Sequence, residues 1–370
     1  MNCPDAQTRR AFALALVDGT GTGAHHAATT VLVTQRYGIA AAGVVALAAT
    51  GRLAGMALIL RYETRAASEA ELARLFRTLV QVMALASILT IVAAAWAPVW
   101  VVLLTGSVWA ATNSASSSLA VSAVPREVIR YAPWSLNGAA IGATLVGAAI
   151  AASPLAGVIA GVLVELAQLL EPRLARPWSF PAIHGVPLRS VLVSMGRGFT
   201  MAALTYGPVL LYAALTTTLV GPVWVGPAMA AYAVGSLCAG RLDQLLPCWR
   251  RWPTLLVLAA ASLSMWLLAV HPLGLIGGRF VGGALMFAAG GRLLRSALGE
   301  DGARTTTKLA ATTTGLGIGA GVSAAVYGLA VDAFGLSHAV LGGVVVTLGV
   351  VGALSARARK GEHRTADQES

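Results

Sequence analysis

The chain has 370 residues, of which 57% are hydrophobic and only 11% are charged, and its mean hydropathy is +0.75. Soluble domains carry roughly 25% charged residues, so this composition excludes a soluble globular protein and predicts an integral membrane protein. The formal charge of +11 would otherwise indicate a nucleic-acid partner. The basic residues stand instead in short loops beside apolar stretches, and we expect no nucleic-acid binding.

Twelve stretches are apolar enough to cross a bilayer, which takes about 20 residues of helix. The division between the fifth and the sixth depends on Ser153-Pro154 alone. The predicted fold is an all-α polytopic membrane protein with 12 transmembrane helices in two pseudo-symmetric six-helix halves. The predicted spans are 11–34, 39–61, 78–97, 99–123, 134–152, 155–171, 190–215, 222–246, 253–270, 273–296, 309–331 and 335–355.

Basic residues occupy every second loop of this twelve-span scheme, while Arg36 is the only basic residue in the opposite set of loops. Loops rich in arginine and lysine stay in the cytoplasm. The pattern therefore predicts twelve spans with both termini cytoplasmic. The basic loops hold Arg65, Arg74, Arg77, Arg126, Arg130, Arg173, Arg176, Arg189, Arg250, Arg251, Arg304 and Lys308.

A polar, proline-rich segment near residue 180 divides the chain in the middle. We expect an N-terminal half at 1–172, a cytoplasmic linker at 173–188, a C-terminal half at 189–356 and a cytoplasmic tail at 357–370. A shift of roughly 180 residues aligns Asp18-Gly19 with Arg197-Gly198, as a duplicated transporter unit would. Nearly the same shift aligns Asn137-Gly138 and Gly142 with Thr314-Gly315 and Gly319, although helices rich in Gly and Ala also produce such matches by chance.

The first span carries ionisable residues inside an apolar stretch. Asp18, Thr22, His25 and Thr29 fall on one helix face. Such a stripe costs free energy unless it faces a partner or water, so it predicts a functional site and favours transport. Asp18 and Arg52 lie at similar depth, and two readings stay open: a structural ion pair, or a carboxyl group that exchanges protons. His25, with an ordinary pKa of about 6.5, suits proton exchange, whereas His26 is expected to pack against a neighbouring helix.

Twelve spans, the VDGTGTG sequence in the first, and VPREVIRYAPWSLNGAAIGATLVGA after the fourth resemble the major facilitator superfamily. VDAFGLSHAVLGGVVV is similar to that family's turn between helices 11 and 12. The basic signature between helices 2 and 3 departs from the family pattern: GRLAGMALILRYETR lacks its Asp, and GSLCAGRLDQLLPCWRR keeps its elements in a distorted order. The Gly-Pro typical of antiporters is missing from helix 5.

The resemblance implies that helices 1, 4, 7 and 10 line a central cavity. Arg197 and Arg279 would then bind an anionic group of the substrate, unless each reaches the interface or a helix-end carbonyl. In this interpretation Arg52 also contributes to substrate binding. Asn113 and Ser117 in the fourth span would hydrogen-bond the substrate, or only serve close helix packing. Tyr206 and Tyr212 would form an aromatic wall, and Glu165 lies nearer a span end.

The predicted function is secondary active transport of a small organic solute, as efflux coupled to protons. An uncoupled facilitator or importer on the same fold stays open, as does a membrane-embedded enzyme or partner protein without transport. No enzyme motif, metal site or cofactor is expected, and the energy source would be the proton gradient. Arginine outnumbers lysine 24 to 2, which favours a bacterial cytoplasmic (inner) membrane. The expected partners are the small-molecule substrate and the lipid bilayer, with the protein as a monomer.

Overall fold

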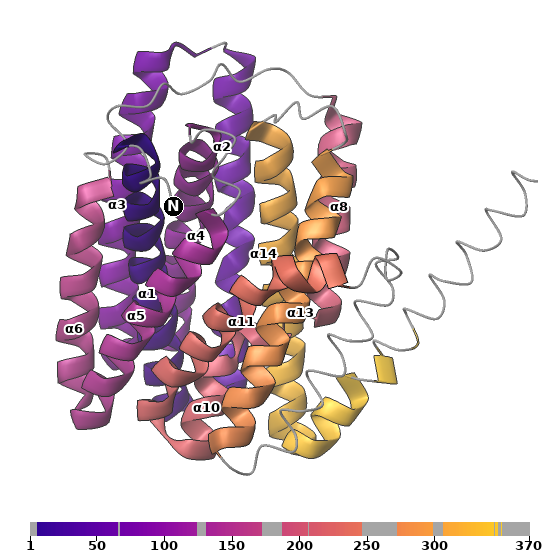
Figure 1. Cartoon of the computed structure of the whole chain (residues 1–370). Coiled ribbons are helices and arrows are strands. Elements are labelled where there is room, and N and C mark those ends of the chain that lie inside the picture. The colour runs from indigo at the N-terminus through magenta and orange to yellow at the C-terminus, as the bar shows by residue number, and fades with distance from the viewer. Residues whose placement is uncertain are drawn as a thin grey trace, which may run out of the picture.

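The computed structural model of the chain is built of helices (Figure 1). It describes residues 6–65, 67–123, 131–171, 187–205, 207–245, 272–298 and 306–343, with 345, 346 and 349. In Figure 1, α3, α5 and α6 lie toward one side and α8 and α13 toward the other, with α10 and α11 in the lower middle. The elements are α1 (Ala6–Val45), η1 (Ala46–Gly51), α2 (Arg52–Thr64), α3 (Glu69–Trp96), α4 (Val99–Ala123), α5 (Tyr131–Ala152), α6 (Pro154–Ala167), η2 (Gln168–Leu170), α8 (Leu188–Thr205), α9 (Gly207–Leu210), α10 (Tyr212–Val220), η3 (Pro222–Trp224), α11 (Val225–Leu245), α13 (Pro272–Leu298) and α14 (Thr306–Phe334), followed by helical residues 336–343.

The described helices coincide with ten of the predicted spans. These are the first eight spans, 11–34 to 222–246, and the tenth and eleventh spans, 273–296 and 309–331. The predicted ninth span, 253–270, lies outside the described residues, and the twelfth is described only in part. By length and composition alone, five described helices are able to cross a membrane: Phe12–Tyr62, Glu69–Trp96, Ser135–Ala152, Pro222–Ala239 and Ala310–Phe334. Two more, Pro154–Leu170 and Pro272–Ala288, are apolar but shorter. The chain is a multi-pass, all-helical membrane protein.

The stretch Phe12–Tyr62 contains two helices that run in opposite directions. As one helix, its 51 residues would extend about 75 Å, far beyond a hydrocarbon core of about 30 Å. Gly38 interrupts it with a φ of 86°, a conformation that glycine adopts readily. Just before this break, Arg36 Nη1 and Tyr37 Oη each donate to the carbonyl oxygen of Ala97 at 3.0 Å, at the end of α3. The chain therefore reverses at Gly38, where the sequence predicts the first loop.

Two predicted boundaries differ from the structure for identifiable reasons. Helix α3 begins at Glu69, well before predicted residue 78, because Ser68 and Glu71 form a capping box: the Ser68 amide donates to Glu71 Oε2 at 2.7 Å. The predicted helix 190–215 corresponds to α8, α9 and α10, and the described break lies at Leu211, whose φ of −83° and ψ of 7° separate α9 from α10. The sequence places Pro208 three residues earlier, and proline lacks the N–H that a continuous helix needs.

The weakest predicted division, at Ser153-Pro154, is confirmed. Helix α5 ends at Ala152 and α6 begins at Pro154, with Ser153 in an extended conformation between them. The Ser153 hydroxyl accepts a hydrogen bond from the Ala156 amide at 3.0 Å, and Pro154 takes the first helical position, where a missing N–H costs nothing. A short polar cap is thus enough to separate two apolar helices.

The same glycine-mediated packing occurs twice in the fold. In the contact of α1 with α5, a Cβ on Gly138 would overlap the Leu16 carbonyl, and one on Gly142 would overlap the Thr20 carbonyl. In the contact of α8 with α14, Gly315 and Gly319 meet the carbonyls of Met195 and Phe199 in the same way. These are the glycines that the sequence alignment pairs. Both contacts bring helix backbones close together, as small residues do in membranes.

This packing predicts a large cost for a side chain at Gly142. We expect Gly142→Leu to lower the unfolding temperature of the detergent-solubilised protein strongly, because the backbone of α1 leaves no room and overpacking costs about 1–3 kcal/mol even where side chains can yield. Gly277→Leu on α13 is the matched control, since a Cβ there meets nothing within 4 Å. Equal unfolding temperatures for the two variants would contradict the tight α1–α5 contact.

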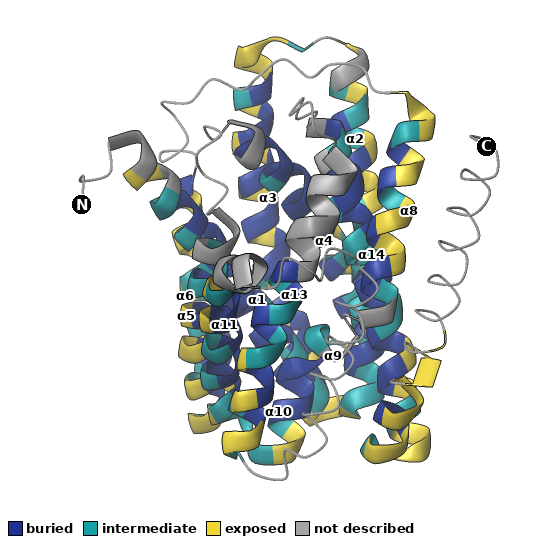
Figure 2. Cartoon of the chain, turned by 45° about the vertical axis from the view of Figure 1, so that its right-hand side comes forward, coloured by how far each residue is buried: buried dark blue, intermediate teal, exposed yellow. Residues whose placement is uncertain are grey.

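The outer faces of the helices carry large apolar side chains. Leu155, Ile159 and Leu163 on α6 are all more than half exposed, and Figure 2 shows exposed residues along the perimeter with buried residues in the middle. Exposed apolar surface of this extent would be a liability in water. It is what a helix presents to lipid, in agreement with the predicted membrane location.

Candidate functional site

The ionisable stripe of α1 faces the interior of the α1–α6 bundle. Asp18, His25 and Thr29 are 8%, 4% and 4% exposed. The opposite face of α1 packs on α5 through Gly19 and Gly23, which approach the backbone of α5. The stripe is thereby directed toward α3, α4 and α6. The sequence predicts that this stripe faces a partner or water, and in the structure it is buried among neighbouring helices.

His25 is fixed by two contacts from neighbouring helices. Its Nδ1 lies 2.6 Å from the Ser87 hydroxyl of α3, in a hydrogen bond whose direction depends on the imidazole tautomer. Its ring stacks on Trp109 of α4, with ring centroids 3.7 Å apart and an interplanar angle of 11°. Two such partners hold the imidazole in one orientation.

His26 is the more accessible of the two histidines. It is half-buried and meets the Trp109 ring edge-on, with centroids 5.1 Å apart. The positive charge of Arg52 acts on it. His26 thus packs against a neighbouring helix, as the sequence predicts, while His25 is enclosed between α3 and α4.

Arg52 contacts α14 and forms no ion pair with Asp18. Its Nη1 donates to the Thr313 carbonyl of α14 at 3.4 Å. A Cβ on Gly317 would overlap the Arg52 side chain, so the absence of a side chain at that position makes room for the arginine. Arg52 thus links α2 to a helix of the C-terminal part of the chain. This finding removes the structural ion pair as an explanation for the buried Asp18.

Asn113 and Ser117 form a pair on α4. The Ser117 hydroxyl donates to Asn113 Oδ1 at 3.2 Å. Asn113 is 6% exposed, whereas Ser117 is half-buried. The hydroxyls of Ser116 and Ser118 donate to backbone carbonyls of α4. Most of this polar stretch is therefore satisfied within the helix, and Ser117 is its most accessible hydroxyl.

Arg279 of α13 lies between two tyrosine rings. Its guanidinium carbon is 4.6 Å from the ring centroid of Tyr212 and 4.4 Å from that of Tyr232. The side chain is 1% exposed, and its Nε lies 3.5 Å from the Ala228 carbonyl of α11. Cation–π contacts of this kind contribute about 2 kcal/mol when desolvated. Arg279 joins α13 to α10 and α11, and Tyr232 is a partner that the sequence analysis missed because it lies in another predicted span.

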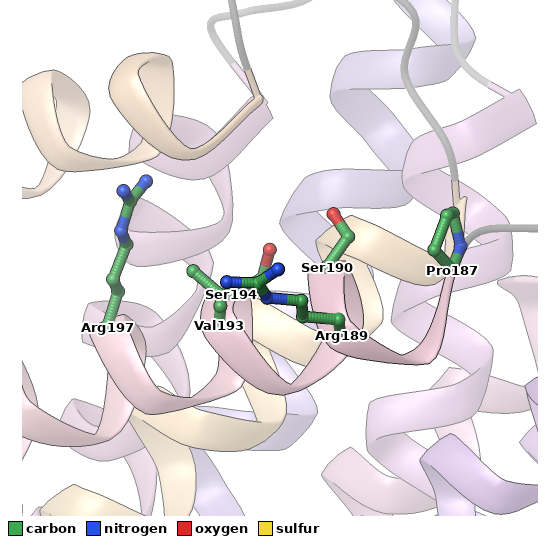
Figure 3. A pocket seen from close by; sticks show the side chains of 6 residues that line it. All are labelled: Pro187, Arg189, Ser190, Val193, Ser194 and Arg197. Atoms are coloured by element: carbon green, nitrogen blue, oxygen red, sulfur yellow. The ribbon is translucent and has the colours of Figure 1, made fainter.

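Arg197 lies apart from Arg279, exposed on α8. It lines a pocket of about 340 Å³ with Pro187, Arg189, Ser190, Val193 and Ser194 (Figure 3). These side chains follow one another along one side of α8. The pocket thus brings together two guanidinium groups, which are suited to carboxylate or phosphate, and the hydroxyls of two serines. Tyr206, the other predicted aromatic residue of this span, lies outside the described residues.

No family model matches the chain, and no curated protein matches it. Solved structures do match the chain. The nucleoside transporter NupG is 10% identical with a TM-score of 0.62, and 95% of this chain covers 99% of that structure. A bacterial homologue of the human lysosomal transporter Spinster, in an inward-facing and unoccupied conformation, is 15% identical with a TM-score of 0.64; the alignment covers 95% of this chain and 96% of that one.

The chain has the fold of these transporters. By their descriptions both are transporters. At such low identity the likeness concerns the fold, and the roles of individual side chains rest on the contacts of this chain.

The sequence analysis also missed a buried polar cluster at the end of α6. Glu165, Gln168 and Glu171 are 0%, 1% and 2% exposed. Their spacing of three residues places them along one face of the helix, which is a signal visible in the sequence. Their nearness to a predicted loop concealed it, because polar residues at span ends usually reach water.

Proposed function

We propose that the protein is a secondary active transporter that moves a small organic solute across the bacterial cytoplasmic membrane by alternating access. The observation that carries this proposal is a fold shared over 95% of the chain with two transporters. The chain adds its own support, since ionisable residues within membrane helices mark ion or substrate pathways. We propose efflux as the direction, with import as the alternative outcome.

The proposed architecture has twelve spans in two six-helix halves. Its support is the equivalence of two helix pairs, α1 with α5 and α8 with α14, each joined through glycines at matching positions. Duplicated units of this kind are common among transporters. Arg52 extends from one proposed half to the carbonyl of Thr313 in the other. A contact of this type has to break and re-form when two halves rock against each other.

The proposed substrate carries an anionic group. Arg189 and Arg197 support this proposal, because both line the pocket on α8 and neither forms an ion pair within the described residues. Arginine binds carboxylate and phosphate in a planar, two-point geometry. Asn113 and Ser117 on α4 would complement it with hydrogen bonds.

We propose proton coupling through Asp18 and His25. Asp18 is buried without an arginine partner, and His25 is held by Ser87 in the same bundle. A buried carboxyl group without a cation is expensive when ionised, which favours proton uptake. Transport driven by a proton gradient needs a group of this kind that gains and loses a proton in each cycle.

The direct test of the transport proposal compares small molecules inside and outside cells with and without the gene. An exporter raises the internal concentration of its solute when the gene is removed, and an importer lowers it. A solute with a carboxylate or phosphate group is expected. Unchanged profiles on both sides of the membrane, under growth conditions in which the protein is produced, would contradict the proposal.

The proposed topology predicts labelling from opposite sides of the membrane. Single cysteines introduced at Leu219, which is 38% exposed in the last turn of α10, and at Arg173 are expected to react with an impermeant thiol reagent from the periplasm and from the cytoplasm, respectively. The reason is that arginine-rich loops are retained in the cytoplasm. Labelling of both positions from the same side would exclude the twelve-span arrangement.

A further inference from the structure

Helix α6 has one face for lipid and one for the protein interior. Leu155, Ile159 and Leu163 are exposed along one side, at four-residue intervals. Gly161 and Glu165 share the other side, where Glu165 is fully buried. Glu165 is therefore directed into the bundle, away from lipid and away from the nearest loop.

The contacts between α1 and α6 show which residues of the two helices lie at the same height along the helix axes, which is called their level below. A Cβ on Gly161 would lie 3.7 Å from the Ala28 Cβ, and one on Gly21 would overlap the Gln168 side chain. The two helices are thus antiparallel, with residue numbers that sum to 189 at facing positions. In this register Glu165 stands at the level of His25 and Glu171 at the level of Asp18. Gln168 lies between them, against the gap that Gly21 leaves.

Polar groups from three helices surround Glu165. Asp18 and His25 face it from α1, and the charge of Asp18 acts on Glu165 and on Glu171. Ser87 of α3 lies beside Glu165 while its hydroxyl pairs with His25 Nδ1. Helix α5 packs against α6 as well, but its described side chains between 135 and 152 include no titratable group. In this register, the residue nearest to Glu165 that can carry a positive charge is His25.

The polar atoms of this cluster are poorly matched with hydrogen-bond partners. Both polar atoms of the Gln168 amide and Oε1 of Glu171 are buried and unpartnered within the described residues. The buried carboxyl oxygens of Glu165 have beside them the Ser87 hydroxyl, which pairs at 2.6 Å with His25 Nδ1 instead. Arg52, the closest arginine in α2, is directed to α14. Each unpaired buried charge destabilises the folded protein, and two neighbouring carboxylates repel each other as well. A neutral carboxylic acid removes both costs and gains an O–H donor for a neighbouring oxygen.

We propose that Glu165 is a proton-binding site inside the α1–α3–α6 bundle, where the Gln168 amide and Glu171 complete the polar cluster and Ser87 connects it to His25. The carboxylate takes up one proton to become the neutral acid and returns that proton when it is released. A metal ion is the less suitable ligand, because the described histidine, cysteine, aspartate and glutamate side chains form no group of three that could hold one.

This inference rests on the proposed function for its use in transport. Asp18 and Glu171 lie closer to the proposed cytoplasmic ends of α1 and α6, and His25 lies deeper. Glu165 would then store the proton between Asp18 and the Ser87–His25 pair, inside one half of the protein. Proton movement would be separate in space from the pocket on α8 and from the contact between Arg52 and α14.

Infrared spectroscopy of the purified, full-length protein tests the proposal without substrate or gradient. At about pH 7 ordinary carboxyl groups are ionised, so a C=O stretching band of a protonated acid reports an exceptional site. We expect this band in the natural protein, a clearly weaker band in Glu165→Gln, where only Asp18 and Glu171 can still contribute, and a shifted band in Glu165→Asp. Ser87→Ala should also shift the band, because it frees His25 beside the acid. Glu69→Gln, at an exposed position on α3, should leave the spectrum unchanged.

The outcomes separate this proposal from the transport proposal. An identical band in the natural protein and in Glu165→Gln, or no such band at about pH 7, would overturn the proton site whatever the transport activity. If Glu165→Gln does not fold, unshifted bands in Glu165→Asp and Ser87→Ala would overturn it equally. Loss of the band on adding sodium at constant pH would assign a sodium site instead. A titrating Glu165 in a protein that moves no solute would contradict only the proposed function.

Discussion

Asp18→Asn is expected to abolish uphill transport while leaving the fold intact. Asparagine keeps the shape of the side chain but cannot gain or lose a proton. Asp18 has no arginine partner in the structure, since Arg52 contacts Thr313 of α14, so the substitution leaves no cation unpaired. In proteoliposomes with an imposed pH gradient, we expect accumulation of the solute to fall at least tenfold. Exchange of solute without a gradient should be retained.

The control for this prediction is Asp332→Asn, which neutralises an exposed aspartate near the end of α14. It should transport at the rate of the natural protein. His25→Gln should give a milder defect than Asp18→Asn, because the hydrogen bond with Ser87 can be made by an amide. Full gradient-driven accumulation by Asp18→Asn would show that this carboxyl group does not couple transport to protons.

Arg197 and Arg279, the two arginines that the sequence predicts for substrate binding, should respond differently to replacement by glutamine. Arg197 is exposed in the pocket on α8, so Arg197→Gln should weaken the affinity for an anionic solute at least tenfold and leave the unfolding temperature unchanged. Arg279 is enclosed by Tyr212 and Tyr232. Arg279→Gln removes two buried cation–π contacts, each contributing up to about 2 kcal/mol, and should lower the unfolding temperature clearly.

Arg279→Lys refines this comparison, because lysine keeps the charge but not the planar group that stacks on two rings. We expect it to restore only part of the lost stability. The measurements are the concentration dependence of transport and the thermal unfolding of each variant in detergent. If Arg197→Gln binds the solute as tightly as the natural protein, Arg197 has no part in recognition. If Arg279→Gln is as stable as the natural protein, the enclosure by tyrosines is not structural.

The course of the helices could be predicted from the sequence because the bilayer imposes a length and an apolar composition on each of them. Ser153-Pro154 ends a helix through local chemistry alone, and the structure confirms it. The pairing of Gly138 and Gly142 with Gly315 and Gly319 was also visible, and the structure gives it a physical meaning in the α1–α5 and α8–α14 contacts.

The partners of the polar side chains could not be predicted in the same way. Helix periodicity gives the angle between His25 and His26 but not which of them faces the bundle. That choice depends on Gly19 and Gly23 packing against α5. Similar depth placed Asp18 and Arg52 within reach of each other, but depth says nothing of direction around the helix axis. Gly317, 265 residues further along the chain, provides the space that Arg52 occupies.

The measurement that tests the account most directly is gradient-driven transport by the purified protein. Proteoliposomes would be incubated with a small-molecule extract of the producing cells, with and without an imposed pH gradient, and their contents compared by mass spectrometry with those of protein-free liposomes. At least one anionic solute is expected to accumulate only with both protein and gradient, and Asp18→Asn is expected to abolish this accumulation. Contents that match protein-free liposomes for every solute, under either polarity of the gradient, would contradict it.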